Sequence, residues 1–232
     1  MSRYSIALGK IPEKVSNKKY IFSDESKELS GLILYRIRAL RDIGDEVKKG
    51  DLGGFIESEI NLSQENNCWV SENVYVYGNA CVYGNAQVYG NAQVYENAQV
   101  SGNAKVYGEA RVYGTARVSG KAQVYENAQV SGNVYVYGTT WVYENAHVSG
   151  TAWVYENAHV SENAQVYENA RIFGNAKVFG NAQVSGTAQI YGDALVWGNA
   201  VVWGNALVSG NAQVSGHALV SGTAQIYGNA QV

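Results

Sequence analysis

Aliphatic residues recur at every sixth position over most of the chain. From Val70 to Val232, all 28 positions at this spacing are Val or Ile. The residue two places earlier is Ala in 24 of the 28 units, and the exceptions are Cys68, Val74, Val134 and Thr140. Residues two apart in an extended chain lie on the same face, so each unit predicts a four-residue strand with Ala and Val buried. The unbroken period predicts a stacked repeat architecture.

Each unit ends in a two-residue corner. The first corner residue is Gly in 20 of 27 units and Glu in the other seven, and Asn follows the Glu in all seven. Gly and Asn adopt a positive φ more readily than other residues do. We therefore expect one positive-φ residue in each corner, supplied by Gly or, in the Glu units, by Asn. No helix pattern follows these glycines, so they do not predict a phosphate-binding loop.

Three such units make a coil of 18 residues. The outward residue before each Val changes character in consecutive triplets, which favours three strands per coil over two. The triplets are Gln87, Gln93 and Gln99; Lys105, Arg111 and Arg117; and Leu195, Val201 and Leu207. The predicted fold class is all-β, a left-handed parallel β-helix of about nine coils. It is triangular in section and carries an N-terminal β-hairpin cap.

The first third of the chain is a different kind of sequence. Residues 1–66 hold 11 Lys or Arg and 11 Asp or Glu, against 6 and 9 in residues 67–232. Alternating apolar and polar residues predict strands over 19–23 and 32–43, with a polar loop at 24–31. A hairpin of these strands would shield the open strand edges of the first coil.

We divide the chain into three parts. Residues 1–50 form a capping β domain, 51–69 an irregular first coil that begins near Leu52, and 70–232 the regular β-helix. Ile56 and Leu62 fall in phase with the Ala column, which places them in the interior of the first coil.

The repeat resembles that of the hexapeptide-repeat superfamily, which has an aliphatic residue first and a small residue fifth. This resemblance implies a left-handed β-helix, and the enzymes of the superfamily are mostly acyltransferases. The segments Val47-Lys-Lys-Gly-Asp-Leu-Gly-Gly-Phe-Ile, Asn61-Leu-Ser and Trp69-Val are similar to a narrower group, the YdcK-like hexapeptide-repeat proteins of bacteria and their phages. The likeness covers about residues 33–232 and implies a bacterial or phage origin. The activity of that group is not established.

The residue types that carry catalysis are sparse in the repeat. Acyltransferases of the superfamily have an extruded loop, a catalytic His in a subunit cleft and a C-terminal helix, and the sequence shows no sign of these. His147 and His159 take outward positions on different faces, and His217 lies in a corner. The corner Glu residues are spread around the prism, and Cys81 has no base beside it. We therefore predict no enzyme activity and no catalytic, cofactor-binding or metal-binding residues.

Two surface features predict contacts with other molecules. Outward apolar residues gather late in the chain and form a candidate oligomer interface of Leu195, Trp197, Val201, Trp203, Leu207, Leu219 and Val232. The residue after each Val is aromatic in 17 of 27 units, and rings 18 residues apart should stack. This gives a candidate aromatic track of Tyr89, Tyr107, Tyr125 and Tyr143. The track either protects the strands by ring packing or binds sugar rings or a second rod.

Charge and composition exclude some classes of binding partner and bear on the cellular location. The formal net charge of −3, with 16% charged residues, gives no basic footprint for nucleic acid or anionic lipid. The N-terminus lacks the apolar core of a signal peptide and no run of 18 apolar residues occurs, so we expect a cytoplasmic protein with reduced cysteines.

The sequence therefore predicts a non-enzymatic, self-associating structural rod. We expect a homo-oligomer that binds neither nucleic acid nor membrane. Two alternatives stay open. One is an acyltransferase-like transferase that acts at a subunit interface, and the other is a module that binds a glycan on its Tyr and Trp rows.

Overall fold

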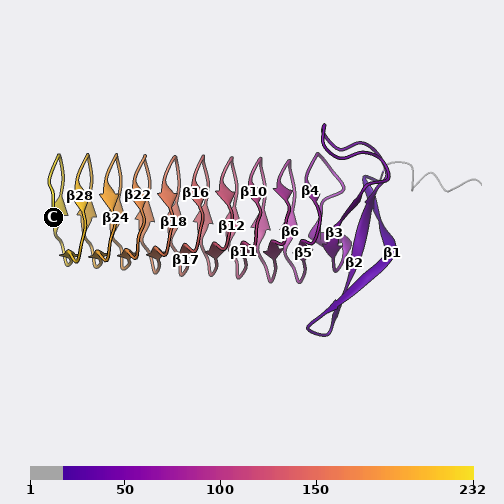
Figure 1. The fold of residues 1–232 in the computed structure, drawn as a ribbon, viewed down its shortest axis with the longest axis horizontal. Coiled ribbons are helices and arrows are strands. Elements are labelled where there is room, and N and C mark those ends of the chain that lie inside the picture. The colour runs from indigo at the N-terminus through magenta and orange to yellow at the C-terminus, as the bar shows by residue number, and fades with distance from the viewer. Residues whose placement is uncertain (1–17) are drawn as a thin grey trace, which may run out of the picture.

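The computed structural model describes residues 18–232, and it consists of a long stack of β-coils with a hairpin at its N-terminal end (Figure 1). Residues 1–17, the first part of the predicted capping domain, lie outside the described residues. Strands β4 to β30 recur every six residues and are two residues long. The predicted all-β solenoid of 18-residue coils is confirmed, although its strands are shorter than the four residues expected.

Three parallel sheets form the sides of the solenoid. The β5 sheet contains β3 (Leu52–Ile56), β5 (Tyr75–Val76), β8 (Gln93–Val94), β11 (Arg111–Val112), β14 (Gln129–Val130), β17 (His147–Val148), β20 (Gln165–Val166), β23 (Gln183–Val184), β26 (Val201–Val202) and β29 (Leu219–Val220). The β4 sheet contains β4 (Trp69–Val70), β7 (Gln87–Val88), β10 (Lys105–Val106), β13 (Gln123–Val124), β16 (Trp141–Val142), β19 (His159–Val160), β22 (Lys177–Val178), β25 (Leu195–Val196) and β28 (Gln213–Val214). The β6 sheet contains β6 (Cys81–Val82), β9 (Gln99–Val100), β12 (Arg117–Val118), β15 (Tyr135–Val136), β18 (Trp153–Val154), β21 (Arg171–Ile172), β24 (Gln189–Ile190), β27 (Leu207–Val208) and β30 (Gln225–Ile226).

Equivalent residues of neighbouring regular coils are 18 apart in sequence. Lys105 pairs with Gln87 on one side and with Gln123 on the other. Backbone N–H groups of one coil donate to carbonyl groups of the next, as from Tyr89 to Val106 with an N–O distance of 3.0 Å. Each predicted triplet is therefore a belt around one coil, with one member on each sheet.

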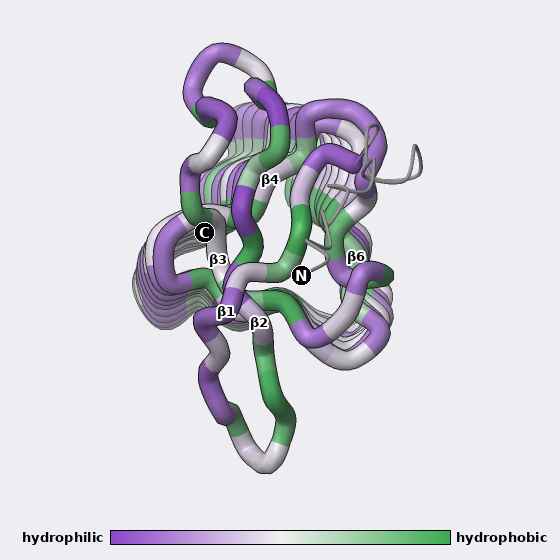
Figure 2. Tube along the Cα trace, turned by 90° about the vertical axis from the view of Figure 1, so that its right-hand side faces the viewer, coloured by the Kyte–Doolittle hydropathy of each residue, from purple (hydrophilic) through white to green (hydrophobic). Residues whose placement is uncertain are grey.

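The Ala and Val columns fill the interior of the solenoid. Val124 and Ala122 are 0% exposed, as are nearly all members of the two columns. Figure 2 looks along the solenoid from its capped end and shows hydrophilic residues gathered at the outer corners. Thr140, which replaces an Ala, is also buried, and its hydroxyl donates to the Tyr137 carbonyl at 2.5 Å. Burial of each Val contributes about 1.5 kcal/mol or more to folding.

The corners differ from the prediction in the Glu units. Gly corners have a positive φ, for example 73° at Gly114. In all seven Glu units the Glu itself has a positive φ, between 55° and 62°, and the following Asn does not. The prediction that Asn supplies this conformation is wrong. The Glu96 carboxylate accepts a hydrogen bond from the Gly114 N–H of the next coil at 2.8 Å. This bond offsets part of the ~1–2 kcal/mol cost of a left-handed residue.

Asn has another role in the corners, which is to link neighbouring coils. The Asn145 side chain donates to Asn163 at 3.2 Å, and Asn163 donates to Asn181 at 3.1 Å. Where Thr replaces Asn, as at Thr115, its hydroxyl donates to Asn133 in the same way at 3.2 Å. Ladders of stacked amides are a known source of stability in regular β-stacks. The Asn preference therefore reflects side-chain bonding between coils.

The N-terminal hairpin consists of β1 (Tyr20–Leu29) and β2 (Leu32–Ala39). A two-residue turn joins them, and both turn residues, Ser30 and Gly31, have a positive φ, which suits the twist of a hairpin. Strand β2 also pairs with β3 in antiparallel fashion, so the hairpin continues the β5 sheet beyond the solenoid.

Two predicted boundaries in this hairpin are wrong. Most of the segment 24–31 is strand rather than loop, and the second strand ends at Ala39 rather than at residue 43. The polar residues in this segment pair across the ribbon instead of forming a loop, and the Arg36 guanidinium lies 3.0 Å from the Glu25 carboxylate. A solvent-exposed ribbon can therefore be charged along its length.

The first coil is two residues longer than the others. Ile56 pairs with Val76 and Leu62 with Val82, both at a separation of 20 residues. These residues therefore continue the Val column, and their assignment to the Ala column is wrong. The additional residues lie in the loop between Leu62 and β4.

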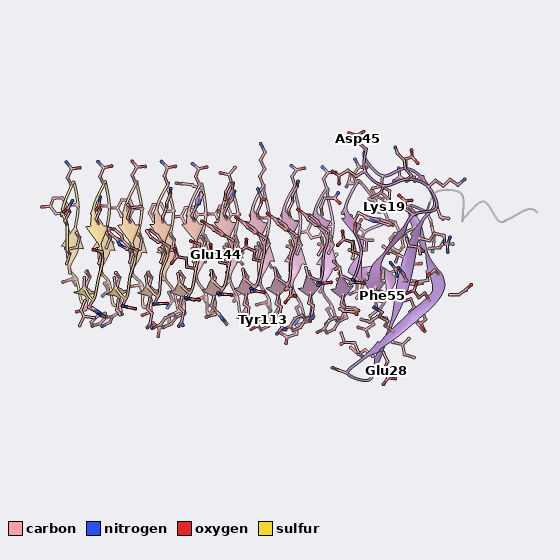
Figure 3. The ribbon with its side chains drawn as sticks, in the orientation of Figure 1. Lys19, Glu28, Asp45, Phe55, Tyr113 and Glu144 are labelled. Atoms are coloured by element: carbon pink, nitrogen blue, oxygen red, sulfur yellow. The ribbon has the colours of Figure 1, made fainter. Side chains whose placement is uncertain are left out.

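Lys19 fills the space that this loop leaves, where the hairpin meets the first coil (Figure 3). Its side chain is fully buried, and its Nζ donates to the Cys68 carbonyl at 2.8 Å and lies 3.0 Å from the Cys68 Sγ. Burial lowers the pKa of Lys19. Cys68, which stands where most units have Ala, thus places a polarisable sulfur beside the buried Lys19 amine.

Candidate functional site

A stack of four tyrosine rings runs along the β4 sheet. The centroid distances are 4.7 Å between Tyr89 and Tyr107, 4.8 Å between Tyr107 and Tyr125, and 5.1 Å between Tyr125 and Tyr143. Successive rings are within 5° of parallel. The expected stacking of the candidate track is therefore observed.

The ring faces inside this stack are occupied by each other. A sugar ring binds an aromatic side chain through its flat face, and Tyr107 and Tyr125 have a tyrosine on both faces. The other two sides of the rod carry similar stacks, which are Tyr77, Tyr95 and Tyr113, and Tyr137, Tyr155, Phe173 and Tyr191. Repetition of the stacks on all sides favours ring packing over a dedicated sugar track.

We expect alkaline pH to unfold the rod because its stacked tyrosines resist ionisation. Burial and the charges of neighbouring tyrosines raise the pKa of Tyr95 to about 12 and of Tyr125 to about 12. An unfolded tyrosine has a pKa of about 10. Because the folded pKa lies above the unfolded one, the neutral tyrosines stabilise the fold. Their contribution to the free energy of unfolding is complete below pH ~10 and is lost as the pH rises toward 12.

Phenolate absorbance and circular dichroism, followed together from neutral pH upward, test this expectation. We expect ionisation and loss of strand signal to coincide, and Tyr125→Phe to raise the midpoint of the transition. Tyrosines that ionise smoothly near pH ~10 in an intact fold would contradict it.

The residues of the candidate oligomer interface lie on all three sides of the rod. Leu195 is on the β4 sheet, Val201 on the β5 sheet and Leu207 on the β6 sheet. Val201 pairs with Leu219 of the next coil on the β5 sheet. Trp203 lies two residues after Val201 and is 39% exposed, and Leu219 is 67% exposed. We call Val201, Trp203 and Leu219 the apolar patch.

The two remaining interface residues lie elsewhere. Trp197 stacks on Phe179 at 5.8 Å, so part of its surface is used within the chain. Val232 is 49% exposed, and its backbone N–H donates to Gln213 at 2.9 Å. A single flat partner can therefore contact only part of the predicted set.

The three histidines do not share a sheet or a corner. His147 is on the β5 sheet, His159 is on the β4 sheet and His217 is in an exposed corner. Burial and the charge of Lys177 lower the pKa of His159, whose ring stacks on Trp141 at 5.0 Å. This stacked imidazole is neutral at pH 7.

The surroundings of Cys81 do not activate its thiol, and Cys68, which lies beside the Lys19 amine, is closed off from solvent. Burial raises the pKa of the Cys81 thiol, and the charge of Cys68 raises it further. Cys68 itself is fully buried. Because the thiolate is the nucleophile, a raised pKa makes Cys81 a weak nucleophile at neutral pH.

The corner Glu residues are less scattered than predicted. Glu126, Glu144 and Glu162 follow one another on one corner at separations of 18 residues, and Glu72 lies on the same corner three coils earlier. The Glu144 carboxylate accepts a hydrogen bond from the Glu162 N–H at 2.6 Å. Figure 3 labels Glu144 on this corner. The Glu144 carboxylate, bonded to the backbone in this way, supports the corner.

A cleft next to the first tyrosine of the stack is the feature that the sequence analysis missed. The loop between β2 and β3 bends back over the β4 sheet, and Asp45 lies at its tip (Figure 3). The cleft beneath it has a volume of about 370 Å³, and a second hollow of about 190 Å³ adjoins it. Its lining includes Glu46, Ser71, Glu72, Gln87, Tyr89 and Lys105. In the sequence, the segment that begins at Val47 indicated only a resemblance to the YdcK-like proteins, because nothing in it indicates where the loop folds.

The described residues hold no group of three or more His, Cys, Asp or Glu side chains arranged for a metal ion. In residues 18–232, no helix has the length and apolar character needed to cross a membrane.

Comparison with known proteins identifies the repeat. The family model described as YdcK beta solenoid repeat matches residues 75–90, 86–102, 98–114, 110–126, 128–144, 170–186 and 188–204. No curated protein matches the chain. Each matched segment covers about one coil, so the likeness concerns the architecture of the rod.

Proposed function

We propose that the chain, which carries the YdcK beta solenoid repeat, is a non-enzymatic structural rod that self-associates. Two copies associate side by side through the apolar patch. The observation that carries this proposal is the exposure of Trp203 and Leu219 on neighbouring coils of the β5 side, where Val201 pairs with Leu219 and the Trp203 N–H donates to the Val220 carbonyl at 2.9 Å. A contiguous exposed apolar surface is typical of an interaction site.

A second copy of the chain is the partner that best suits the patch. A two-fold axis through the patch would bring Trp203 and Leu219 of each copy against the same surface of the other. Charged residues are absent from the three positions of the patch, so its burial requires no ion pairing. An aromatic residue beside an aliphatic one is typical of an interface centre.

An acyltransferase-like site between subunits is the alternative from a different class. The separation of His147, His159 and His217 favours the structural proposal for the single chain. Turnover of an acyl-CoA with saturable binding would favour the alternative.

We expect the double variant Trp203→Gln with Leu219→Gln to weaken self-association by at least about tenfold, or about 1.4 kcal/mol. Light scattering coupled to size-exclusion chromatography measures this as a shift from oligomer to monomer. The matched control is Trp153→Gln, because Trp153 is 38% exposed on the β6 sheet, outside the patch. A parent chain that is monomeric at every concentration contradicts the proposal, as does equal dissociation by the control.

A further inference from the structure

The cleft beside Tyr89 is a preformed space rather than an accidental gap between segments. The loop above it is fixed by a bond from the Ile43 N–H to the Val47 carbonyl at 2.9 Å. Ile43 is only 3% exposed and anchors the loop in the core. The Asp42 carboxylate accepts hydrogen bonds from the Lys49 N–H at 2.9 Å and from the Lys48 ammonium at 3.2 Å. The loop thus has a defined conformation over the β4 sheet.

Tyr89 offers this cleft an aromatic face that no ring of the stack covers. One face of Tyr89 lies against Tyr107 at 4.7 Å. The equivalent residue one coil earlier is Ser71, which is too small to cover the other face. Both Ser71 and Tyr89 line the cleft. Tyr89 is therefore an end of its stack that lies in the cleft and can contact a ligand there through the flat of its ring.

Polar groups of both signs surround this ring. Glu46 comes from the loop, Glu72 from the neighbouring corner and Lys105 from β10. Burial and the charge of Tyr107 raise the pKa of Tyr89, and the charges of Glu46 and Glu72 raise it further. Both carboxylates therefore lie near the phenol. Two carboxylates and one ammonium leave the cleft with a net negative charge. None of the ion pairs in the described part of the chain involves these three residues.

Gln87 adds an uncharged hydrogen-bonding group. Its Nε2 donates to the Asn67 carbonyl at 2.8 Å, which orients the amide and leaves its oxygen to accept from a ligand. An aromatic face flanked by carboxylates, an amide and an ammonium matches a pyranose ring, which has an apolar face of C–H groups and a rim of hydroxyl groups. The net negative charge favours a pyranose that carries an amino group.

We infer that the cleft formed by Tyr89, Glu46, Glu72, Gln87 and Lys105 binds an amino sugar. The pyranose lies on Tyr89, its ammonium faces the two carboxylates, and its hydroxyl groups bond to Gln87 and Lys105. This inference is independent of self-association, because the apolar patch lies in distant coils on another sheet.

Saturation-transfer NMR with glucosamine as the ligand and glucose as its uncharged comparator tests the inference. We expect saturable binding of glucosamine and about fivefold weaker binding of glucose, as loss of an exposed charge pair implies. Tyr89→Ala should weaken glucosamine binding about tenfold. The double variant Glu46→Gln with Glu72→Gln should lower the affinity for glucosamine to the affinity for glucose.

The matched control for Tyr89 is Tyr191→Ala. Tyr191 also ends a stack, lying 4.9 Å from Phe173, but on the β6 side of the rod. We expect this variant to bind glucosamine as the parent does. The inference is overturned if glucosamine shows no saturable binding, if glucose binds equally well, or if the two Tyr variants behave alike. The same titration on the double variant Trp203→Gln with Leu219→Gln shows whether glucosamine binding depends on self-association. We expect it to be unchanged.

Discussion

Val124→Asp is expected to destabilise the protein by at least about 4 kcal/mol and to unfold the coils around residue 124. Val124 is 0% exposed and pairs with Val106 and Val142 in the coils before and after it. A carboxylate at this position would have no hydrogen-bonding partner in a column of Val and Ala. Burial of an unpaired charge is among the most costly single changes in a protein.

The matched control for this change is Gln123→Asp. Gln123 is the neighbouring residue of β13, but its side chain faces outward and is half-buried. We expect the control to shift the melting curve only slightly, because its carboxylate remains in contact with water. Thermal melting followed by circular dichroism distinguishes the two variants. Equal melting of Val124→Asp and the parent would show that the interior assignment is mistaken.

Hydrogen exchange adds a spatial test of the same prediction. Each coil contacts only the coils before and after it, so the stability of a solenoid is close to a sum of local terms. Amides near Val106 and Val142 should lose protection first, and those near the hairpin should keep it. Uniform loss of protection along the rod would indicate a cooperative unit larger than neighbouring coils.

The second large effect concerns the corners, where Gly114→Val is expected to cost at least about 3 kcal/mol. Gly114 has a φ of 73°, which β-branched residues scarcely adopt. A Cβ placed there would lie 2.6 Å from the Gly132 nitrogen of the next coil. That neighbour is backbone, so the two coils would have to move apart and weaken their hydrogen bonds.

Gly114→Glu is the informative comparison: its Cβ meets the same Gly132 backbone, so we expect it also to destabilise, by about 1 kcal/mol less than Val, because its carboxylate can form a bond that Val cannot. Glu96 occupies the same corner one coil earlier with a φ of 62°, and its carboxylate accepts the Gly114 N–H. A Glu at 114 can make the same bond to Gly132. Chemical denaturation measures the difference between the two variants. If Val and Glu destabilise equally, the carboxylate bond contributes nothing to the tolerance of Glu in corners.

The sequence alone determined the architecture of the rod. Its six-residue period, the small and aliphatic columns and the outward triplets predicted three-sided coils of 18 residues. The stacking of Tyr89, Tyr107, Tyr125 and Tyr143 followed from the same count. These predictions succeeded because a period repeated 28 times has few ways to bury every Val at once.

The tertiary structure decided the features that depend on contacts between coils. Local preference favoured Asn for the positive φ, yet Glu96 and its equivalents adopt it, and four of their carboxylates bond to the N–H of the next coil, those of Glu96, Glu144, Glu156 and Glu168. The two additional residues of the first coil moved Ile56 and Leu62 to the Val column and made room for Lys19. A sequence pattern shows which residues are neighbours along the chain, whereas these bonds join residues about one coil or more apart.

The same distinction applies to the candidate sites. The sequence identified the apolar residues near Trp203 and the tyrosine row, because each is visible as a run of equivalent positions. It gave no indication of the cleft at Tyr89, whose lining comes from a loop, a corner and two strands. Only the folding of the loop over the β4 sheet brings Glu46 to Lys105, because no repeat period relates these two residues.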